Sequence, residues 1–229
     1  MNNSMNNFWV KYTQSNQPFF ILAPMEDVTD VVFRQVVKKA NQGRPQILFT
    51  EFTNCDGICS VGQSRVIHRL RYNPDTERPI VAQIWGKTPN NYRQTAKLCL
   101  ELGFDGIDIN MGCPEKSVIR QGSCSALINN QTLAQEIIQA TQEGSEGRIP
   151  ISVKTRIGFR KIQTEEWFNF LFEHNLQAIT IHGRTVSGSN DPANWEEITK
   201  VVSLKKARQQ KQLEAIKDNW IMQLEAMII

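Results

Sequence analysis

Short apolar runs alternate along the chain with longer stretches whose apolar residues recur at three- and four-residue spacing. The first pattern is typical of buried strands and the second of amphipathic helices. The predicted strands are Phe19–Ala23, Gln46–Thr50, Pro79–Ile84, Gly106–Asn110, Ile151–Thr155 and Ala178–His182. The predicted helices between them are Thr29–Ala40, with Val32, Val36 and Val37 on one face, Asn90–Leu102, Thr132–Glu143 and Glu165–His174.

Strands that alternate with helices predict a parallel sheet. The strand starts are separated by 27, 33, 27, 45 and 27 residues, and a (β/α)₈ barrel repeats about every 30 residues. The competing structure is an open doubly wound sheet. No G-x-G-x-x-G motif follows the first strand, which disfavours the dinucleotide-binding version of that sheet. We therefore predict an α/β fold of the TIM (β/α)₈-barrel type, incomplete at about six βα units.

The strand pattern stops after the sixth unit. Residues 205–213 read KKARQQKQL, which has too few apolar positions for the interior of a sheet. From Lys205 to Ile229 there is no Gly or Pro, and the residues at helical spacing are Leu213, Ile216, Trp220, Leu224 and Met227. We predict an N-terminal extension over residues 1–18, a partial barrel over 19–204 and an amphipathic helical tail over 205–229. The two open edges of such a sheet are a liability for solubility.

Composition narrows the class of protein. The chain has 229 residues, of which 40% are hydrophobic and 21% are charged, as in ordinary globular proteins. No apolar run approaches the roughly 18 residues of a membrane span, and no secretory signal begins the chain, so we expect a cytoplasmic protein without a membrane partner. The net charge of +3 permits an RNA partner without arguing for one. The five cysteines form no C-x-x-C pair, so no metal site is expected.

Polar residues recur at the carboxyl ends of the predicted strands, where barrel enzymes keep their chemistry. Six segments, APMEDVTD, AQIWG, DINMGCP, GSCSALI, SVKTRIG and TIHGRT, lie in this order between about Phe19 and Val202. Together they resemble the tRNA-dihydrouridine synthases, and the combination of DINMGCP with APM and HGRT is specific. The resemblance implies an FMN-dependent barrel that reduces uridine in tRNA to 5,6-dihydrouridine, with NADPH as the reductant.

Three features of the family have no counterpart in this sequence. The family's later strands carry an Asn-Gly-Asp-type segment and a Gly-Arg segment that hold the FMN phosphate, and a helical domain that helps to grip tRNA follows them. The last 25 or so residues of this chain resemble none of these. We therefore expect a member of the family that is truncated or frameshifted after about residue 204.

Cys113, in DINMGCP, is the candidate catalytic residue. Reduction of the uracil C5=C6 bond adds hydride at C6, which is conjugated to the C4 carbonyl, so the charge that develops at C5 and O4 requires a proton. A thiol with an ordinary pKa of about 8.5 is protonated at neutral pH and can donate that proton to C5. The alternative for Cys113 is a buried structural cysteine. We assign no role to the other four cysteines.

The resemblance places the candidate cofactor-binding residues around the flavin: Pro24, Met25, Glu26, Gln83, Lys154 and His182. A cation at Lys154 would stabilise the anionic N1/O2 edge of reduced flavin, and alternation points Lys154 and Val153 to opposite faces of their strand. Gln83 would bond the pyrimidine edge of the ring. The alternative for Lys154 is a lysine that reaches water, and the alternative for His182 is a core histidine. The alternative for the loop at Pro24 is a plain proline-containing turn.

Asn110 and Arg184 are the candidate tRNA contacts, because Asn can read a uracil edge and Arg can clamp a phosphate. The alternative for Arg184 is a surface salt bridge. Lys116 and Arg120 either meet RNA or form a solvated charged face. Two other functions remain open, namely an inactive barrel fragment or RNA-binding remnant, and an FMN barrel dehydrogenase of a small molecule. The sequence does not indicate an oligomeric state.

Overall fold

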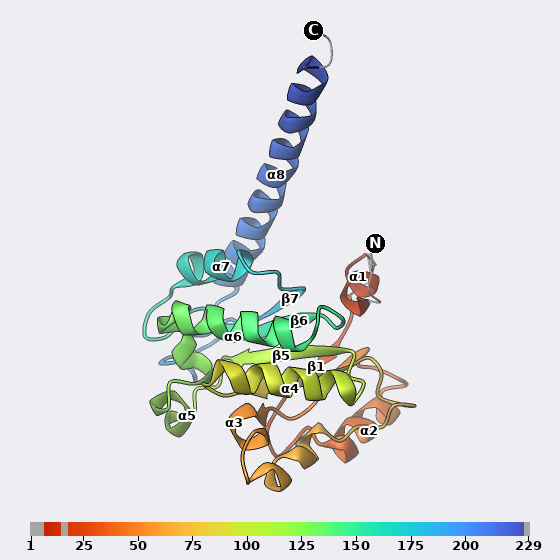
Figure 1. Cartoon of the computed structure of the whole chain (residues 1–229). Helices are drawn as coiled ribbons and strands as arrows, with labels where there is room; N and C mark the ends of the chain where they lie inside the picture. The colour runs from red at the N-terminus through yellow and green to blue at the C-terminus, as the bar shows by residue number, and fades with distance from the viewer. Residues whose placement is uncertain (1–6, 15–17, 227–229) are drawn as a thin grey trace.

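The computed structural model describes residues 7–14 and 18–226, with side chains placed as far as residue 212 except at Thr13. A curled parallel sheet forms the centre of the molecule (Figure 1). Its strands follow one another in the order β1 (Ile21–Leu22), β2 (Ile47–Phe49), β4 (Ile80–Trp85), β5 (Gly106–Met111), β6 (Ile151–Arg156) and β7 (Ala178–His182). A further two-residue strand, β3 (Thr53–Asn54), pairs with the end of β4. This is an incomplete (β/α) barrel, so the predicted fold class is confirmed.

Four longer helices lie within two residues of their predicted bounds: α2 (Val31–Ala40), α4 (Pro89–Glu101), α6 (Gln131–Gly144) and α7 (Thr164–Phe172). Asp30 caps α2 by accepting the N–H of Phe33 at 2.7 Å, and Pro89 opens α4. The sequence did not predict the short helices, which are α1 (Phe8–Thr13), α3 (Cys55–Ile58), α5 (Lys116–Arg120), η1 (Gln63–Arg65), η2 (Ile67–Leu70) and η3 (Cys124–Asn129). Each is too short to show a helical period.

The last helix, α8 (Trp195–Ala226), begins ten residues before the predicted tail and runs through residue 204 without a break. In Figure 1 it leads away from the sheet. The predicted apolar stripe consists of Leu213, Ile216, Trp220, Leu224 and Met227. The side chains of these residues lie outside the part of the chain whose side chains the structure describes. No helix in the described ranges combines the length and the hydropathy that a membrane span requires.

The two faces of the sheet pack against different partners. Alternate residues such as Ile107, Ile109 and Val153 join the main core with α4, α6 and α7. On the opposite, inner face, Ile47, Phe49 and Val81 enclose Trp9 of α1, which is 4% exposed. The N-terminal extension therefore contributes a helix that closes the amino end of the barrel lumen.

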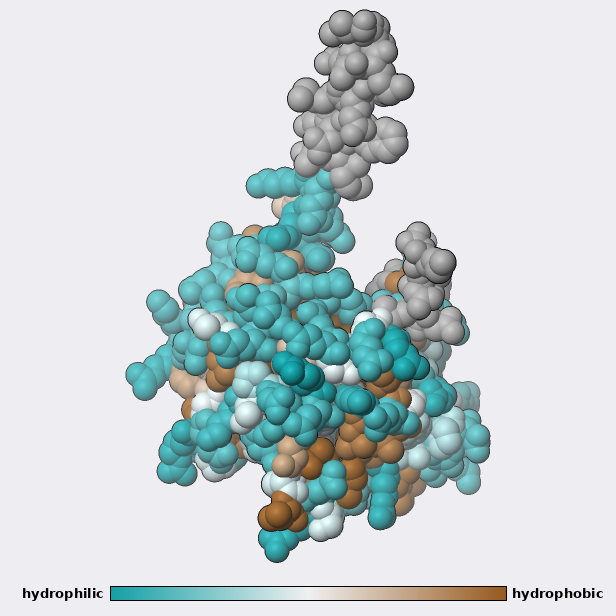
Figure 2. Space-filling view, in the orientation of Figure 1, coloured by the Kyte–Doolittle hydropathy of each residue, from teal (hydrophilic) through white to brown (hydrophobic). Residues whose placement is uncertain are grey.

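The apolar face of α2 is not covered. Val32 and Val36 are 63% and 59% exposed, whereas Arg34 on the same helix is fully buried. Arg34 Nε lies 2.8 Å from Oε1 of the equally buried Glu77, so an ion pair fastens α2 to the chain ahead of β4. The exposure follows from the fold, because β1 is an edge strand with β2 as its one neighbour. Figure 2 shows hydrophobic surface gathered in the region of α2.

Candidate active site

A tight turn after β5 carries Cys113. Asn110 Oδ1 accepts the backbone N–H groups of Gly112 and Cys113, both at 3.0 Å. Arg156 Nε donates to the Gly112 carbonyl at 2.7 Å, and the Ser125 hydroxyl donates to the Cys113 carbonyl at 2.7 Å. Three elements thus hold the turn, and the position of the Cys113 thiol is determined by side chains from β5, β6 and η3.

The half-buried Cys113 thiol packs against the buried side chains of Cys124 and Trp85. A hydrogen bond from the Cys124 thiol lowers the pKa of Cys113 to about 7; burial opposes this, and the backbone N–H of Glu115 assists it. The carboxylates of Glu26 and Glu115 raise the pKa. The folded chain therefore lowers the pKa of Cys113 below the ordinary thiol value of about 8.5 that the sequence suggests.

A connected layer of polar side chains crosses the lumen below this turn. Gln83 Nε2 donates to Asp108 Oδ2 at 2.7 Å, and the Ser152 hydroxyl donates to Asp108 Oδ1 at 2.6 Å. Asn110 Nδ2 donates to Gln83 Oε1 at 3.1 Å. Burial raises the pKa of Asp108 to about 6 against these hydrogen bonds and the charge of Lys154. The layer therefore holds the amide of Gln83 in one orientation.

Lys154 lies beside this layer, opposite Asn110 in the β5–β6 register. Its neighbour Val153 packs into the outer core, so Lys154 faces the lumen. Burial lowers the pKa of Lys154, whereas the Asp108 carboxylate raises it. Within the described residues, no carboxylate lies within ion-pair distance of the Lys154 ammonium. The site thus contains a partly buried cation whose charge is incompletely balanced.

His182 ends β7 and pairs in register with Arg156. Arg184 Nη1 lies 3.2 Å from His182 Nε2. Because a guanidinium only donates, Nε2 accepts and the ring proton resides on Nδ1. Burial and the charges of Arg156, Lys154 and Arg184 lower the pKa of His182 to about 4, so the ring is neutral at pH 7. Arg184 Nε also donates to the Asp191 carbonyl, and the described residues contain no salt bridge to Arg184.

The first loop, which contains Pro24, Met25 and Glu26, reaches the site through Glu26. Its carboxylate forms an ion pair with Arg69 of η2 and lies close enough to Cys113 to raise the thiol pKa. Met25 is 48% exposed, and its backbone N–H donates to the Thr29 hydroxyl at 3.0 Å. The loop is therefore held by Thr29 and by Arg69, and the charge of one of its carboxylates acts on the cysteine.

Four further residues belong to the site, and the sequence reasoning assigned them no role. Asp108 and Arg156 lie two positions from Asn110 and Lys154, and strand alternation was the signal that could have found them. Arg69 and Cys124 come from irregular segments, where no periodic signal exists. Lys116 and Arg120 are exposed on α5, directly after the Cys113 turn.

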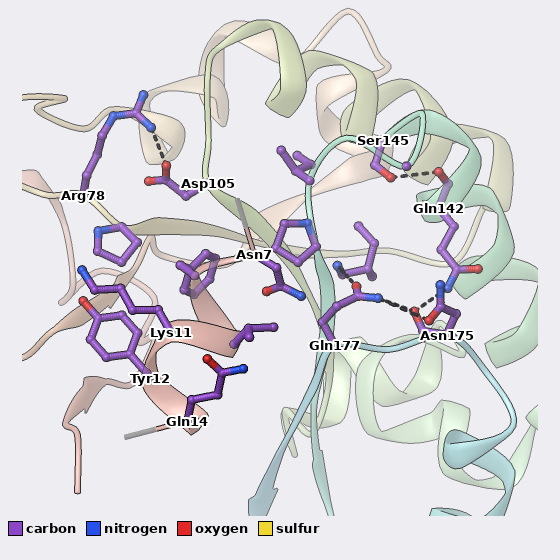
Figure 3. A pocket seen from close by; sticks show the side chains of 17 residues that line it. Asn7, Lys11, Tyr12, Gln14, Arg78, Asp105, Gln142, Ser145, Asn175 and Gln177 are labelled. Atoms are coloured by element: carbon purple, nitrogen blue, oxygen red, sulfur yellow. Dashed lines mark hydrogen bonds and ion pairs between the residues drawn. The ribbon is translucent and has the colours of Figure 1, made fainter. Parts of the chain in front are cut away.

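A separate cavity of about 1190 Å³ lies at the other end of the sheet. Figure 3 shows its lining, from α1 and from the segments that precede β4, β5, β6 and β7. Lys11 and Gln177 line it, and Arg78 Nη1 is paired there with Asp105 Oδ1 at 2.5 Å. It contains none of the predicted site residues. In barrels this end serves stability rather than chemistry.

The fold is an incomplete α/β barrel with polar and thiol side chains at the carboxyl ends of its parallel strands, the end where barrel enzymes keep their active sites. The family model described as "Dihydrouridine synthase (Dus)" matches residues 21–206. The chain belongs to this family. No group of three or more candidate metal ligands occurs in the part of the chain that the structure describes.

Curated relatives bear related names. The chain is 45% identical over 202 residues to the "Probable tRNA-dihydrouridine synthase" of Staphylococcus aureus (strain COL) and to the "Probable tRNA-dihydrouridine synthase 2" of Bacillus subtilis (strain 168). A protein of Staphylococcus epidermidis (strain ATCC 35984 / DSM 28319 / BCRC 17069 / CCUG 31568 / BM 3577 / RP62A), "Probable tRNA-dihydrouridine synthase", is 44% identical over 202 residues. Each alignment covers 87% of this chain and 59% of the relative.

Proposed function

We propose that this chain reduces uridine to 5,6-dihydrouridine in tRNA, in the cytoplasm, with FMN as cofactor and NADPH as reductant. The observation that carries the proposal is the Cys113 thiol, which has a pKa near neutrality and is held in the turn after β5, at the carboxyl end of the sheet. The family membership and the names of the Staphylococcus aureus and Bacillus subtilis relatives support the same reaction.

The polar side chains of the lumen suit the ring of FMN. The Lys154 ammonium, incompletely balanced by Asp108, suits the anionic N1/O2 edge of a reduced flavin. Gln83 uses its oxygen and one N–H within the protein, which leaves its second N–H for the pyrimidine edge. The neutral His182 ring and the Glu26 loop would border the cofactor. When bound, reduced FMN supplies the hydride that uracil C6 receives.

Cys113 supplies the matching proton. The thiol form donates to uracil C5 as negative charge develops there, and the thiolate that remains is stabilised by the Cys124 thiol and the Glu115 N–H. General acids are most effective when their pKa lies close to the working pH. The lowered pKa of Cys113 therefore suits a group that must give up a proton and regain it from solvent in each turnover.

The tRNA must present its uridine outside the base stack, which costs a few kcal/mol. Asn110 retains one N–H for the uracil edge, because Gln83 takes the other and the turn takes the oxygen. Arg184, held by His182 and by the Asp191 carbonyl, would meet a phosphate close to the target. The exposed Lys116 and Arg120 would extend this contact along the RNA backbone.

The Cys113→Ala variant tests the assignment. We expect FMN affinity, measured by flavin fluorescence quenching, to remain within about twofold of the wild type, because the thiol is not part of the ring site. Dihydrouridine formation, measured by mass spectrometry of digested tRNA, should fall about 10²- to 10⁴-fold, as for the loss of a general acid. Cys99→Ala, which removes a fully buried thiol of α4, is the matched control.

Three outcomes separate the alternatives. Retained reduction in Cys113→Ala would contradict the acid role. A wild-type chain that binds tRNA without reducing it would indicate an RNA-binding remnant. Turnover of a small uracil-like substrate in preference to tRNA would indicate a small-molecule dehydrogenase.

Lys154→Met should weaken FMN binding, and unchanged affinity would exclude the proposed ring contact.

A further inference from the structure

Cys124 is a buried nucleophilic group to which the sequence assigned no role. It begins η3, and its side chain is fully buried. Its backbone has a φ of +53°, a left-handed conformation that favours glycine and is unfavourable for a residue with a Cβ. A side chain is therefore maintained at a position where the backbone would prefer none.

The local geometry directs this side chain at Cys113. Cys113 packs against the small buried cluster that Cys124 forms with Trp85 and Val118. The next residue, Ser125, donates its hydroxyl to the Cys113 carbonyl at 2.7 Å. Ser125 of η3 thus holds the backbone of Cys113, and the preceding residue, Cys124, belongs to the cluster against which the Cys113 side chain packs.

We propose that Cys124 is a positioning residue for Cys113. The Cys124 S–H donates to the Cys113 sulfur and stabilises the thiolate that is left after proton transfer. The role in turnover rests on the proposed function, whereas the contact between the two thiols does not. In that step the Cys113 S–H bond breaks and a C–H bond forms at uracil C5. Solvent returns the proton to the half-buried Cys113 sulfur, and Cys124 is not consumed.

The surroundings decide which thiol ionises. Burial raises the pKa of Cys124 well above its usual value, and the hydrogen bond to Cys113 raises it further. Cys113 is only half-buried, and its sulfur also accepts the backbone N–H of Glu115. The Arg156 guanidinium attracts the Cys113 thiolate. The carboxylates of Glu26 and Glu115 oppose the ionisation of Cys113. Cys124 therefore stays protonated and acts as the donor.

The test measures the acidity of Cys113 directly. Iodoacetamide alkylation is followed from about pH 5 to pH 10, and tandem mass spectrometry assigns the label to Cys113. The wild type should show half-maximal reactivity at about pH 7. Cys124→Ala and Cys124→Gly should raise that midpoint by about one pH unit or more, because the donor is lost. Cys124→Ser should leave the midpoint close to that of the wild type, since a hydroxyl also donates a hydrogen bond.

Two features make the result decisive. Cys124→Gly fits the left-handed backbone, so we expect it to remain folded even where Cys124→Ala does not, and urea unfolding checks this. Cys99→Ala removes a buried thiol elsewhere and should leave the midpoint unchanged. An unchanged midpoint in folded Cys124→Gly would overturn the inference. Alkylation requires neither FMN nor tRNA, so failure of the proposed reaction and failure of the thiol contact give different results.

Discussion

Asn110 shows how the surroundings of one residue change what it can do. Its oxygen accepts two backbone N–H groups, and its amide donates to Gln83. The sequence interpretation made it a reader of the uracil edge. In the structure, most of its hydrogen-bonding capacity maintains the turn that carries Cys113, and one N–H remains for a ligand.

His182 gives a pH-dependent prediction. An unfolded histidine takes up a proton at about pH 6.5, whereas His182 in the folded chain does so only at about 4. Between these values the unfolded state binds more protons, so His182 lowers stability as the pH falls through this window. Urea unfolding should show His182→Gln gaining stability relative to the wild type from about pH 6.5 down to 4. A pH-independent difference would contradict the neutral ring.

At the scale of elements, contacts between helices decide whether a substitution helps or harms. α4 and α6 lie side by side in Figure 1, and a Cβ added at Gly144 would lie 2.1 Å from the Arg93 carbonyl oxygen and 2.9 Å from the Ala96 Cβ. Intrinsic helix propensity alone predicts that alanine would stabilise this position by up to about 1 kcal/mol. The close approach of the helices reverses that expectation.

We therefore expect Gly144→Ala to lower the free energy of unfolding by about 1–3 kcal/mol, the usual cost of overpacking. Urea denaturation followed by circular dichroism measures it. Gln135→Ala, at an exposed position of the same helix, is the control and should change stability by less than about 0.5 kcal/mol. Equal effects in the two variants would show that the α4–α6 contact can relax.

For the whole molecule, the two ends of the sheet have separate tasks. Trp9 and the inner-face residues Ile47, Phe49 and Val81 close the amino end. The polar layer and the Cys113 turn occupy the carboxyl end. A change at one end should therefore alter stability and leave the chemistry at the other end unchanged.

Trp9→Ala tests this separation. Removing a buried aromatic ring should cost about 3–5 kcal/mol of unfolding free energy, while the alkylation midpoint of Cys113 stays at about 7 under conditions where the variant is folded. Val10→Ala is the control, since Val10 is 45% exposed, and it should cost less than about 1 kcal/mol. A moved midpoint in Trp9→Ala would show that the two ends are coupled.

Local patterns were sufficient for the six main strands and the four longer helices, and they placed Lys154 and Val153 on opposite faces of their strand, while the resemblance to the family assigned Lys154 to the flavin. These features depend on spacings of two to four residues, which a single sequence displays. The motifs at the strand ends likewise indicated Cys113, because parallel strands bring their carboxyl ends to one edge. The family followed from the same segments.

Tertiary structure alone decided the state of those residues. The lowered pKa of Cys113 depends on Cys124, and the first loop depends on Arg69 of η2, 43 residues from Glu26. The exposure of Val32 on α2 depends on β1 being an edge strand. Periodicity describes which face a side chain takes, whereas its protonation, its partners and its burial depend on groups that only the folded chain brings within a few ångströms.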